Sequence, residues 1–399
     1  MPEEGRKRRH GIGICLSGGG YRATLFHAGA LRRLAELGVL SSPDFRTVSS
    51  VSGGSIAGAF LARAFEWPLR DVPSIDDWNR RFAGPLRVLT RLNIRTGAIA
   101  RSIFPGISAV RELAKRYDQA LGGTRHLSAL PDAFVMCATD LAFGVNWECT
   151  GKQIGDYQAG YIEPPPDWSI GLAVAASSCF PPVFQPLQVP RESGSWRGGK
   201  AKSDSPKKWA SAMKDLRLTD GGVYDNLGLE PVWKDHAQIF VSDAGGIFDF
   251  QADKGQLCWR VMRYQSVQER QTRALRKRWL ISSFKQGVMG GAYWGTGSSR
   301  SSYDENDSLG YSKDLAREVI SEIRTDVDCF SDAEAAVLEN HGYFLADMAV
   351  RTHCPDVATA TDAPLNPPHA CWTPESKGEE EIRKALKDSH TRTFLGCGW

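Results

Sequence analysis

The apolar positions near the N-terminus follow two alternating patterns, one typical of strands and one typical of helices. Residues 11–17 form a short apolar run, and residues 21–37 place leucine and alanine at helical spacing before Gly38, a residue type that commonly ends helices. The pattern then repeats, because residues 45–51 are β-prone and residues 55–65 suit a helix. Two strand–helix units in succession predict a parallel sheet covered by helices.

Later segments carry further periodic patterns. We expect a hairpin over residues 133–139 and 145–150, a strand over 237–242, and helices over 169–178, 256–281, 313–323 and 334–350. Residues 80–104 interleave arginines with leucine, isoleucine and phenylalanine. This segment is predicted to form a helical cap, which either rests on a membrane surface or packs on the core as an amphipathic helix.

Composition divides the chain into segments. The division that we expect is a basic N-terminal segment at 1–10, one large domain at 11–350 and a tail at 351–399, and within the large domain a core over about 11–245, a basic inserted loop over about 189–216 and a helical C-terminal part over about 255–350. The inserted loop is rich in glycine, serine and lysine, and is expected to be flexible. The proline-rich tail has no periodicity that assigns a structure.

The overall composition is that of an ordinary globular protein. The chain has 399 residues, of which 42% are hydrophobic and 24% are charged, so it can bury a large core. A formal net charge of +3 is too small to indicate nucleic-acid binding by itself. No apolar run reaches the ~20 residues of a membrane-spanning helix, and no secretory signal follows the basic run 6–9. Nine cysteines without regular spacing are expected to be reduced, so we expect a cytoplasmic protein. Its association with the membrane is expected to be peripheral, because a spanning run is lacking.

A serine in a turn of small residues is the first feature with chemical meaning. Residues 48–54 read VSSVSGG, which nearly satisfies the G-x-S-x-G nucleophile elbow, with Ser52 as the nucleophile and Ser50 in place of the first glycine. Such a turn strains the backbone and leaves little room for bulky neighbours. The alternative is an ordinary helix N-cap, because serine commonly precedes helices. Ser55 lies nearby, but is expected in the first turn of the helix.

Gly18, Gly19 and Gly20 form the second feature, between a predicted strand and a predicted helix. Glycines let backbone N–H groups converge on an anion, and a helix N-terminus adds a favourable dipole. An oxyanion can be held at such a loop. The loop lacks the G-x-G-x-x-G register of dinucleotide-binding folds and the lysine of a P-loop. A purely structural turn is the remaining alternative.

Asp220, followed by Gly221 and Gly222, belongs to a sequence that is by itself an ordinary turn. It gains interest because a serine hydroxyl needs a base within hydrogen-bond reach to become a good nucleophile. No motif context selects a histidine for this role among His10, His27, His126, His236, His341, His353, His369 and His390. A carboxylate whose pKa is raised by desolvation can serve as the base instead.

Four segments, in this order, resemble the conserved blocks of patatin-like phospholipases. They are SGGGYRA at 17–23, SVSGGS at 50–55, ASSCFPPVF at 176–184 and DGGVYDN at 220–226. The first block is similar to that of cytosolic calcium-dependent phospholipases, whereas the DGG block resembles the patatins. The similarity spans about residues 11–245, and segments 323–326 and 341–343 resemble bacterial members of the family.

The resemblance implies a three-layer α/β/α fold with a helical cap and C-terminal helices, and a function as a lipid acyl hydrolase. It implies that Ser52 attacks the acyl carbonyl and that Asp220 accepts the serine proton, without a histidine. Backbone N–H groups of the loop Gly18, Gly19 and Gly20 would hold the oxyanion. Arg22 would either support this loop or steer a substrate phosphate. An acyl-enzyme would form and be hydrolysed by water.

The resemblance requires no metal, and no cofactor is expected. Residues of the tail region fit no common zinc-site spacing; these are His353, Cys354, His369, Cys371 and Cys397. The expected partner is membrane phospholipid, whereas nucleic-acid binding is not expected even for the basic helix at 260–278. The resemblance leaves open a homo-oligomer, a signal-activated effector that degrades membranes on binding a nucleotide, and a catalytically silent lipid-binding module.

Overall fold

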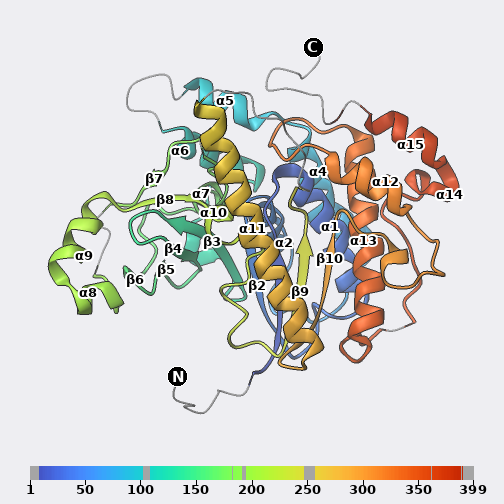
Figure 1. Ribbon diagram of the computed structural model, residues 1–399, viewed down its shortest axis with the longest axis horizontal. Coiled ribbons are helices and arrows are strands. Elements are labelled where there is room, and N and C mark those ends of the chain that lie inside the picture. Colours follow the sequence, from blue (N-terminus) through green and yellow to red (C-terminus); the bar gives the residue numbers. More distant parts are fainter. Residues whose placement is uncertain are drawn as a thin grey trace.

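The computed structural model describes residues 9–101, 108–181, 183–190, 195–246, 257–360, 362–387 and 389. Within these residues a ten-stranded sheet has the order β10-β9-β1-β2-β3-β4-β5-β6, and β8 pairs with both β3 and β7 (Figure 1). The strands are β1 (Ile12–Leu16), β2 (Phe45–Val51), β3 (Phe134–Asp140), β4 (Val145–Cys149), β5 (Ile154–Asp156), β6 (Gly160–Ile162), β7 (Leu187–Gln188), β8 (Arg217–Asp220), β9 (Gln238–Asp243) and β10 (Gly290–Gly295).

Helices surround this sheet. They are α1 (Gly20–Glu36), α2 (Gly53–Ala64), α3 (Ile75–Trp78), a π-helix (Asn79–Ala83), α4 (Gly84–Thr90), α5 (Ile94–Arg101), α6 (Ala109–Ala120), α7 (Ile170–Ser177), α8 (Lys200–Asp204), α9 (Pro206–Ala212), α10 (Gly222–Asp225), α11 (Leu257–Lys285), α12 (Lys313–Glu318), α13 (Asp332–His353), α14 (Pro374–Lys377) and α15 (Glu379–Leu386). No described helix is both long enough and apolar enough to span a membrane.

Alternating side chains of the central strands build two separate cores. On β1, Ile14 and Leu16 belong to the larger core with the residues of α1 and α13, whereas Cys15 belongs to a smaller core. That smaller core contains Val241 of β9 and Leu280 of α11. Because successive strand residues point to opposite faces, the two cores lie on opposite sides of the sheet.

The connections explain which helix covers which face. The β1–α1–β2 and β9–α11–β10 connections step in opposite directions across the parallel part of the sheet. Right-handed crossovers that step in opposite directions place their helices on opposite faces. Figure 1 accordingly shows α11 on one side of β9 and β10, and α1 and α13, which pack together, on the other side. The predicted three-layer α/β/α fold is confirmed, with α4 and α5 in the predicted cap segment and α11, α12 and α13 as the predicted C-terminal helices.

The predicted parallel sheet extends only from β10 to β3. The strands β4, β5 and β6 follow as an antiparallel meander, and β8 pairs antiparallel with β3. The predicted hairpin is therefore confirmed as β3 and β4. The strand β10 is not foreseen, because its glycine-rich sequence lacks the β-branched residues typical of strands.

Two further segments differ from expectation. The inserted segment contains two short helices, α8 and α9, where a flexible loop is predicted, and part of it, 191–194, lies outside the described residues. The tail carries α14 and α15, which are rich in charged residues. They contain too few apolar residues for a helical period to be recognised. The predictions for residues 1–8 and for Cys397 also lie outside the described residues.

The arginine-rich cap segment packs on the protein itself. Leu86 and Leu89 are buried in the larger core. Arg87 pairs with Glu339 of α13 at 2.6 Å, and Arg91 pairs with Asp332 at 2.7 Å. Of the two alternatives for this segment, these contacts favour the amphipathic helix packed on the core. Its predicted apolar residues Ile103 and Phe104 lie outside the described residues.

The cysteines depart in one respect from the expected reduced state. Cys329 is disulfide-bonded, which corrects the expectation for this residue. The free cysteines of the described part are Cys15, Cys137, Cys149, Cys179, Cys354 and Cys371.

Two buried carboxyl groups meet beside the antiparallel meander. The carboxyl groups of Asp140 and Asp156 lie close enough that each shifts the pKa of the other. Oδ1 of Asp156 also accepts the N–H groups of Gln158 and Ala159, both at 2.7 Å. Burial raises the pKa of the Asp156 carboxyl well above its usual range, and the neighbouring Asp140 adds to the shift. The fold therefore favours a protonated carboxyl that the unfolded chain would ionise.

We predict that the free energy of unfolding falls as pH rises from the ordinary aspartate pKa towards the raised one, by up to about 1.4 kcal/mol per pH unit. Asp156→Asn should weaken this dependence and stabilise the protein at alkaline pH, because the amide can donate to Asp140 permanently. Urea unfolding at about pH 5, 7 and 9 measures this. Asp132→Asn, at an exposed aspartate, is the control. Equal pH slopes for wild type and Asp156→Asn would contradict the prediction.

Candidate active site

Ser52 occupies a strained turn between β2 and α2. Its backbone angles are φ 51° and ψ −116°, and no other non-glycine residue of the described part has a positive φ. Such a conformation costs on the order of 1–3 kcal/mol and persists only where the surrounding structure enforces it. Its side chain forms no cap hydrogen bond on α2, so the N-cap alternative does not describe it.

The neighbouring glycines are required by close backbone contacts. A Cβ atom on Gly53 would lie 2.1 Å from the carbonyl oxygen of Gly20, and one on Gly54 would lie 2.2 Å from that of Leu16. Carbon and oxygen cannot approach so closely without a shift of the backbone. The start of α2 therefore rests directly on the glycine loop and on the end of β1.

Three serine hydroxyls brace the turn from below. Ser50 donates to the carbonyl of Val135 at 3.2 Å and accepts from Ser55 at 3.1 Å. Ser177 of α7 accepts the N–H of Ser52 at 2.9 Å, and its oxygen lies 2.8 Å from that of Ser55. A serine at the position of the motif's first glycine is thus accommodated, and Ser55 is a buried supporting residue.

The sheet register brings Asp220 beside this turn. The last residue of β2, Val51, pairs with Cys137 of β3, and the next residue of β3, Ala138, pairs with Asp220 of β8. Asp220 and Ser52 line the same cavity, and Oδ1 of Asp220 accepts the N–H of Gly222 at 2.7 Å. Burial raises the pKa of Asp220 to about 7, whereas the N–H of Gly222 and the nearby hydroxyl of Ser52 act to lower it.

The glycine loop contributes differently from residue to residue. The N–H of Gly18 donates to the carbonyl of Asn226 at 3.1 Å, so this group is engaged, contrary to the expectation that it faces an oxyanion. Among the described residues, the N–H groups of Gly19, Gly20 and Gly53 have no hydrogen-bond acceptor. Gly53, which the sequence reading did not single out, lies against Gly20. Its position directly after the serine is where nucleophile elbows supply an oxyanion donor.

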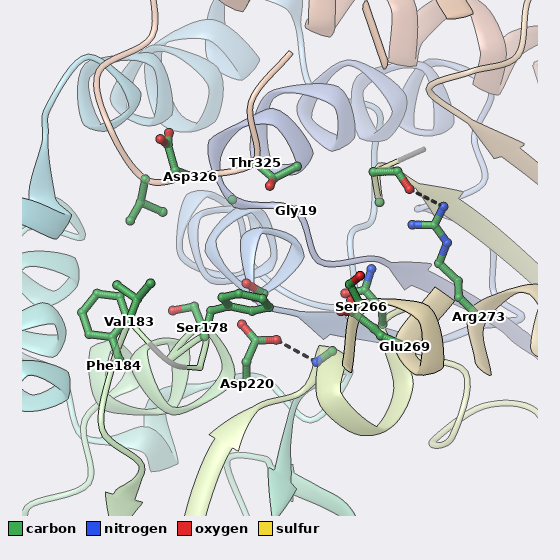
Figure 2. A pocket seen from close by; sticks show the side chains of 18 of the residues that line it. Gly19, Ser178, Val183, Phe184, Asp220, Ser266, Glu269, Arg273, Thr325 and Asp326 are labelled. Atoms are coloured by element: carbon green, nitrogen blue, oxygen red, sulfur yellow. Dashed lines mark hydrogen bonds between the residues drawn. The ribbon is translucent and has the colours of Figure 1, made fainter. Parts of the chain in front are cut away.

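The lining of one cavity of about 310 Å³ includes Ser52, Asp220, Gly19 and Gly20. In Figure 2, Asp220 points into the cavity, with Val183 and Phe184 on one side and residues of α11 on the other. The block at 176–184 therefore forms an apolar wall of the cavity.

The opposite wall is charged and comes from α11. Ser266, Glu269, Arg270 and Arg273 line the cavity at helical spacing. Arg273 donates to the carbonyl of Gly246 at 2.8 Å. Burial raises the pKa of Glu269, and Glu269 in turn raises the pKa of Asp220. The sequence pattern predicts this helix but does not reveal that it reaches the cavity.

Arg22 lies behind the cavity, outside its lining. Its Nε and Nη2 donate to the carbonyl of Ala244 at 3.1 and 2.7 Å, and its Nη1 donates to those of Ser321 and Ile323 at 2.7 and 2.8 Å. Burial lowers its pKa to about 10, assisted by the positive charges of Arg273 and Arg270. Every contact is with backbone carbonyls, which favours support of the loop over contact with a substrate phosphate.

No described histidine lines the cavity. His27 is buried in α1, where its Nε2 lies 2.9 Å from the carbonyl oxygen of Ser17 and its Nδ1 lies 2.8 Å from the hydroxyl of Ser242. Burial lowers its pKa to about 4, so it is neutral at physiological pH and holds the strand that leads into the glycine loop. The described residues contain no group of three or more histidine, cysteine, aspartate or glutamate side chains able to hold a metal ion.

We predict that Gly54→Ala lowers the free energy of unfolding by about 1–3 kcal/mol, because the new methyl group must push α2 away from Leu16. Gly97→Ala is the matched control. Gly97 lies in α5 with no atom closer than 4.0 Å to an added Cβ, so alanine should be neutral or stabilising by up to about 1 kcal/mol. Denaturant unfolding of both variants measures the difference, and equal stabilities would refute the backbone contact.

The chain is similar to several known proteins. The family model described as patatin-like phospholipase matches residues 14–233. No curated protein matches the chain. Among solved structures, human GIVD cytosolic phospholipase A2 is 13% identical, with a TM-score of 0.38, and the match covers 95% of this chain and 63% of that one.

Two further solved structures are similar to the chain. The same human enzyme in complex with methyl gamma-linolenyl fluorophosphonate is 12% identical, with a TM-score of 0.44 and coverage of 95% and 60%. VipD from Legionella pneumophila is 15% identical, with a TM-score of 0.35 and coverage of 87% and 68%. The chain thus spans less than two thirds of the human enzyme. Because the family model covers more than half of its residues, the chain belongs to the patatin-like phospholipase family.

Proposed function

We propose that the protein is a serine-dependent lipid acyl hydrolase that cleaves fatty-acyl esters of phospholipids. The observation that carries this proposal is that Ser52, held in a strained turn, and Asp220, a buried carboxyl whose pKa is raised to about 7, line the same cavity. A carboxylate with a pKa near the working pH can both take up and return a proton. Family membership supplies the class of substrate.

The first half of the reaction transfers the acyl group to the enzyme. The hydroxyl oxygen of Ser52 attacks the ester carbonyl, and Asp220 accepts the hydroxyl proton. The N–H groups of Gly19, Gly20 and Gly53 would donate to the oxyanion of the tetrahedral intermediate. The ester C–O bond then breaks, and Asp220 returns the proton to the leaving alcohol. An acyl-enzyme on Ser52 remains.

The second half regenerates the enzyme. Water enters, Asp220 takes its proton, and the hydroxide attacks the acyl-enzyme carbonyl. When the bond to Ser52 breaks, the proton passes to the serine oxygen and the fatty acid leaves. In this proposal Asp220 handles the proton without a histidine, because it lines the same cavity as Ser52 and no described histidine does. Arg22 acts in this proposal as a supporting residue that fixes the surroundings of the glycine loop.

The two walls of the cavity suit a phospholipid. Val183 and Phe184 offer an apolar surface for an acyl chain, while Arg270 and Arg273 offer guanidinium groups, which match phosphate well. Peripheral membrane contact belongs to the same proposal. A homo-oligomer and a nucleotide activator stay predictions from the resemblance.

We predict that Ser52→Ala and Asp220→Asn each lower fatty-acid release from liposomes by at least about a thousandfold, because each removes one member of the dyad. A fluorophosphonate should label the wild type on Ser52. Since Ser52 and Ser55 fall in the same tryptic peptide, Ser55→Ala serves as the matched control and should retain the label. Binding of liposomes without label or turnover would instead indicate a catalytically silent module.

We also predict that kcat/KM rises with pH through an apparent pKa near 7, because Asp220 must be ionised to act as a base. Glu269→Gln should move this acidic limb to lower pH, since a negative charge that raises the pKa of Asp220 is removed. Glu230→Gln, at a carboxylate outside the cavity lining, is the control. An unmoved limb in Glu269→Gln would argue against Asp220 as the titrating base.

A further inference from the structure

Apolar side chains are exposed at the edge of the proposed active-site cavity. Phe180 lines the cavity and is nevertheless 48% exposed, and Val183 beside it is also exposed. Large apolar side chains that line a cavity and are also exposed to solvent mark its mouth as a binding surface. They sit on the segment that follows α7, opposite the wall formed by α11.

The helix α11 presents two different faces. Ser266, Glu269 and Arg273 face the cavity, whereas Tyr264, Val267 and Leu275 are exposed, Tyr264 by 64% and Leu275 by 59%. Spacings of three and eleven residues from Tyr264 place these three side chains on one side of the helix. One helix thus forms a wall of the cavity with one face and an exposed apolar stripe with the opposite face.

Positive charge greatly exceeds negative charge on α11. Its sequence contains one acidic residue, Glu269, against eight basic residues, which are Arg260, Arg263, Arg270, Arg273, Arg276, Lys277, Arg278 and Lys285. Arg273 and Arg276 lie near buried carboxylates, Asp243 at 3.7 Å and Asp225 at 3.6 Å. Arg278 is exposed close to Leu275. Apolar and aromatic groups beside cations are the composition of helices that lie in the interface of an anionic bilayer.

We propose that the outer face of α11, together with Phe180 and Val183, is the surface that docks on an anionic phospholipid bilayer. The inference rests on the proposed function, because the substrate of that function lies in a bilayer. Charge complementarity selects an anionic leaflet. The same helix forms a wall of the cavity, which selects a lipid surface as the occupant, since a bilayer bound to α11 lies beside the cavity that its lipids must enter.

The cap segment at 80–104 does not offer such a surface. Leu86 and Leu89 face the core, and Arg87 and Arg91 pair with Glu339 and Asp332. Val88 and Leu92 are its exposed apolar residues, at 60% and 52%, and neither lines the cavity. They provide a control pair of exposed apolar side chains at another place on the molecule.

The test measures vesicle binding by the full-length chain in a Ser52→Ala background, so that binding is separated from turnover. Vesicles contain either phosphatidylcholine alone or phosphatidylcholine with about 30% phosphatidylglycerol. We expect at least about tenfold tighter binding to the anionic vesicles, weakened by salt. The double substitution Tyr264→Ser with Val267→Ser should weaken this binding about tenfold, whereas Val88→Ser with Leu92→Ser should leave it within about twofold.

With Ser52 restored, the ratio of the rate on anionic vesicles to the rate on a soluble short-chain ester should fall about tenfold in the α11 variant only. Equal binding by both double variants, or equal binding to both kinds of vesicle, would overturn the proposal. So would a dimer in sedimentation that the α11 substitutions dissociate, because the face would then bind a second copy. Absence of ester hydrolysis and of fluorophosphonate labelling, with the binding pattern intact, would refute the proposed function alone.

Discussion

The direct contact of backbone with backbone at the start of α2 is the constraint on which the candidate site depends. Gly53 touches Gly20 and Gly54 touches Leu16 so closely that no side-chain atom fits between them. This contact fixes the strained angles of Ser52 and sets N–H groups of two different helices side by side. Main-chain packing therefore determines both the conformation of Ser52 and the position of the N–H groups near it.

The layered fold then supplies the rest of the site from opposite sides. The strands β2, β3 and β8 bring Ser52 and Asp220 together through their register, and the crossover helix α11 closes the cavity from the other face of the sheet. Burial is the main cause of the raised pKa of Asp220, and the same helix adds to it through Glu269, while the arginines beside Glu269 supply positive charge. A C-terminal segment that looks accessory along the sequence thus forms part of the site.

Local signals in the sequence were sufficient for the elements that carry the predicted dyad. The turn at Ser52 and the glycines after Asp220 follow strands with clear apolar patterns, so their positions could be predicted. The cavity wall from α11 could not, because it depends on a crossover that returns across the sheet after a long connection. The engaged N–H of Gly18 depends equally on Asn226, which is remote in sequence. Lysine and glycine content concealed α8 and α9.

The hydrogen bonds of the buried guanidinium of Arg22 indicate which part of the chain must fold together. All of its hydrogen-bond acceptors, the carbonyls of Ala244, Ser321 and Ile323, lie beyond residue 233, where the family match stops. A fragment ending there would lack these acceptors and also α13, the helix that packs along α1. The region that defines the family by sequence is therefore not self-sufficient, and its first helix is completed by the last third of the chain.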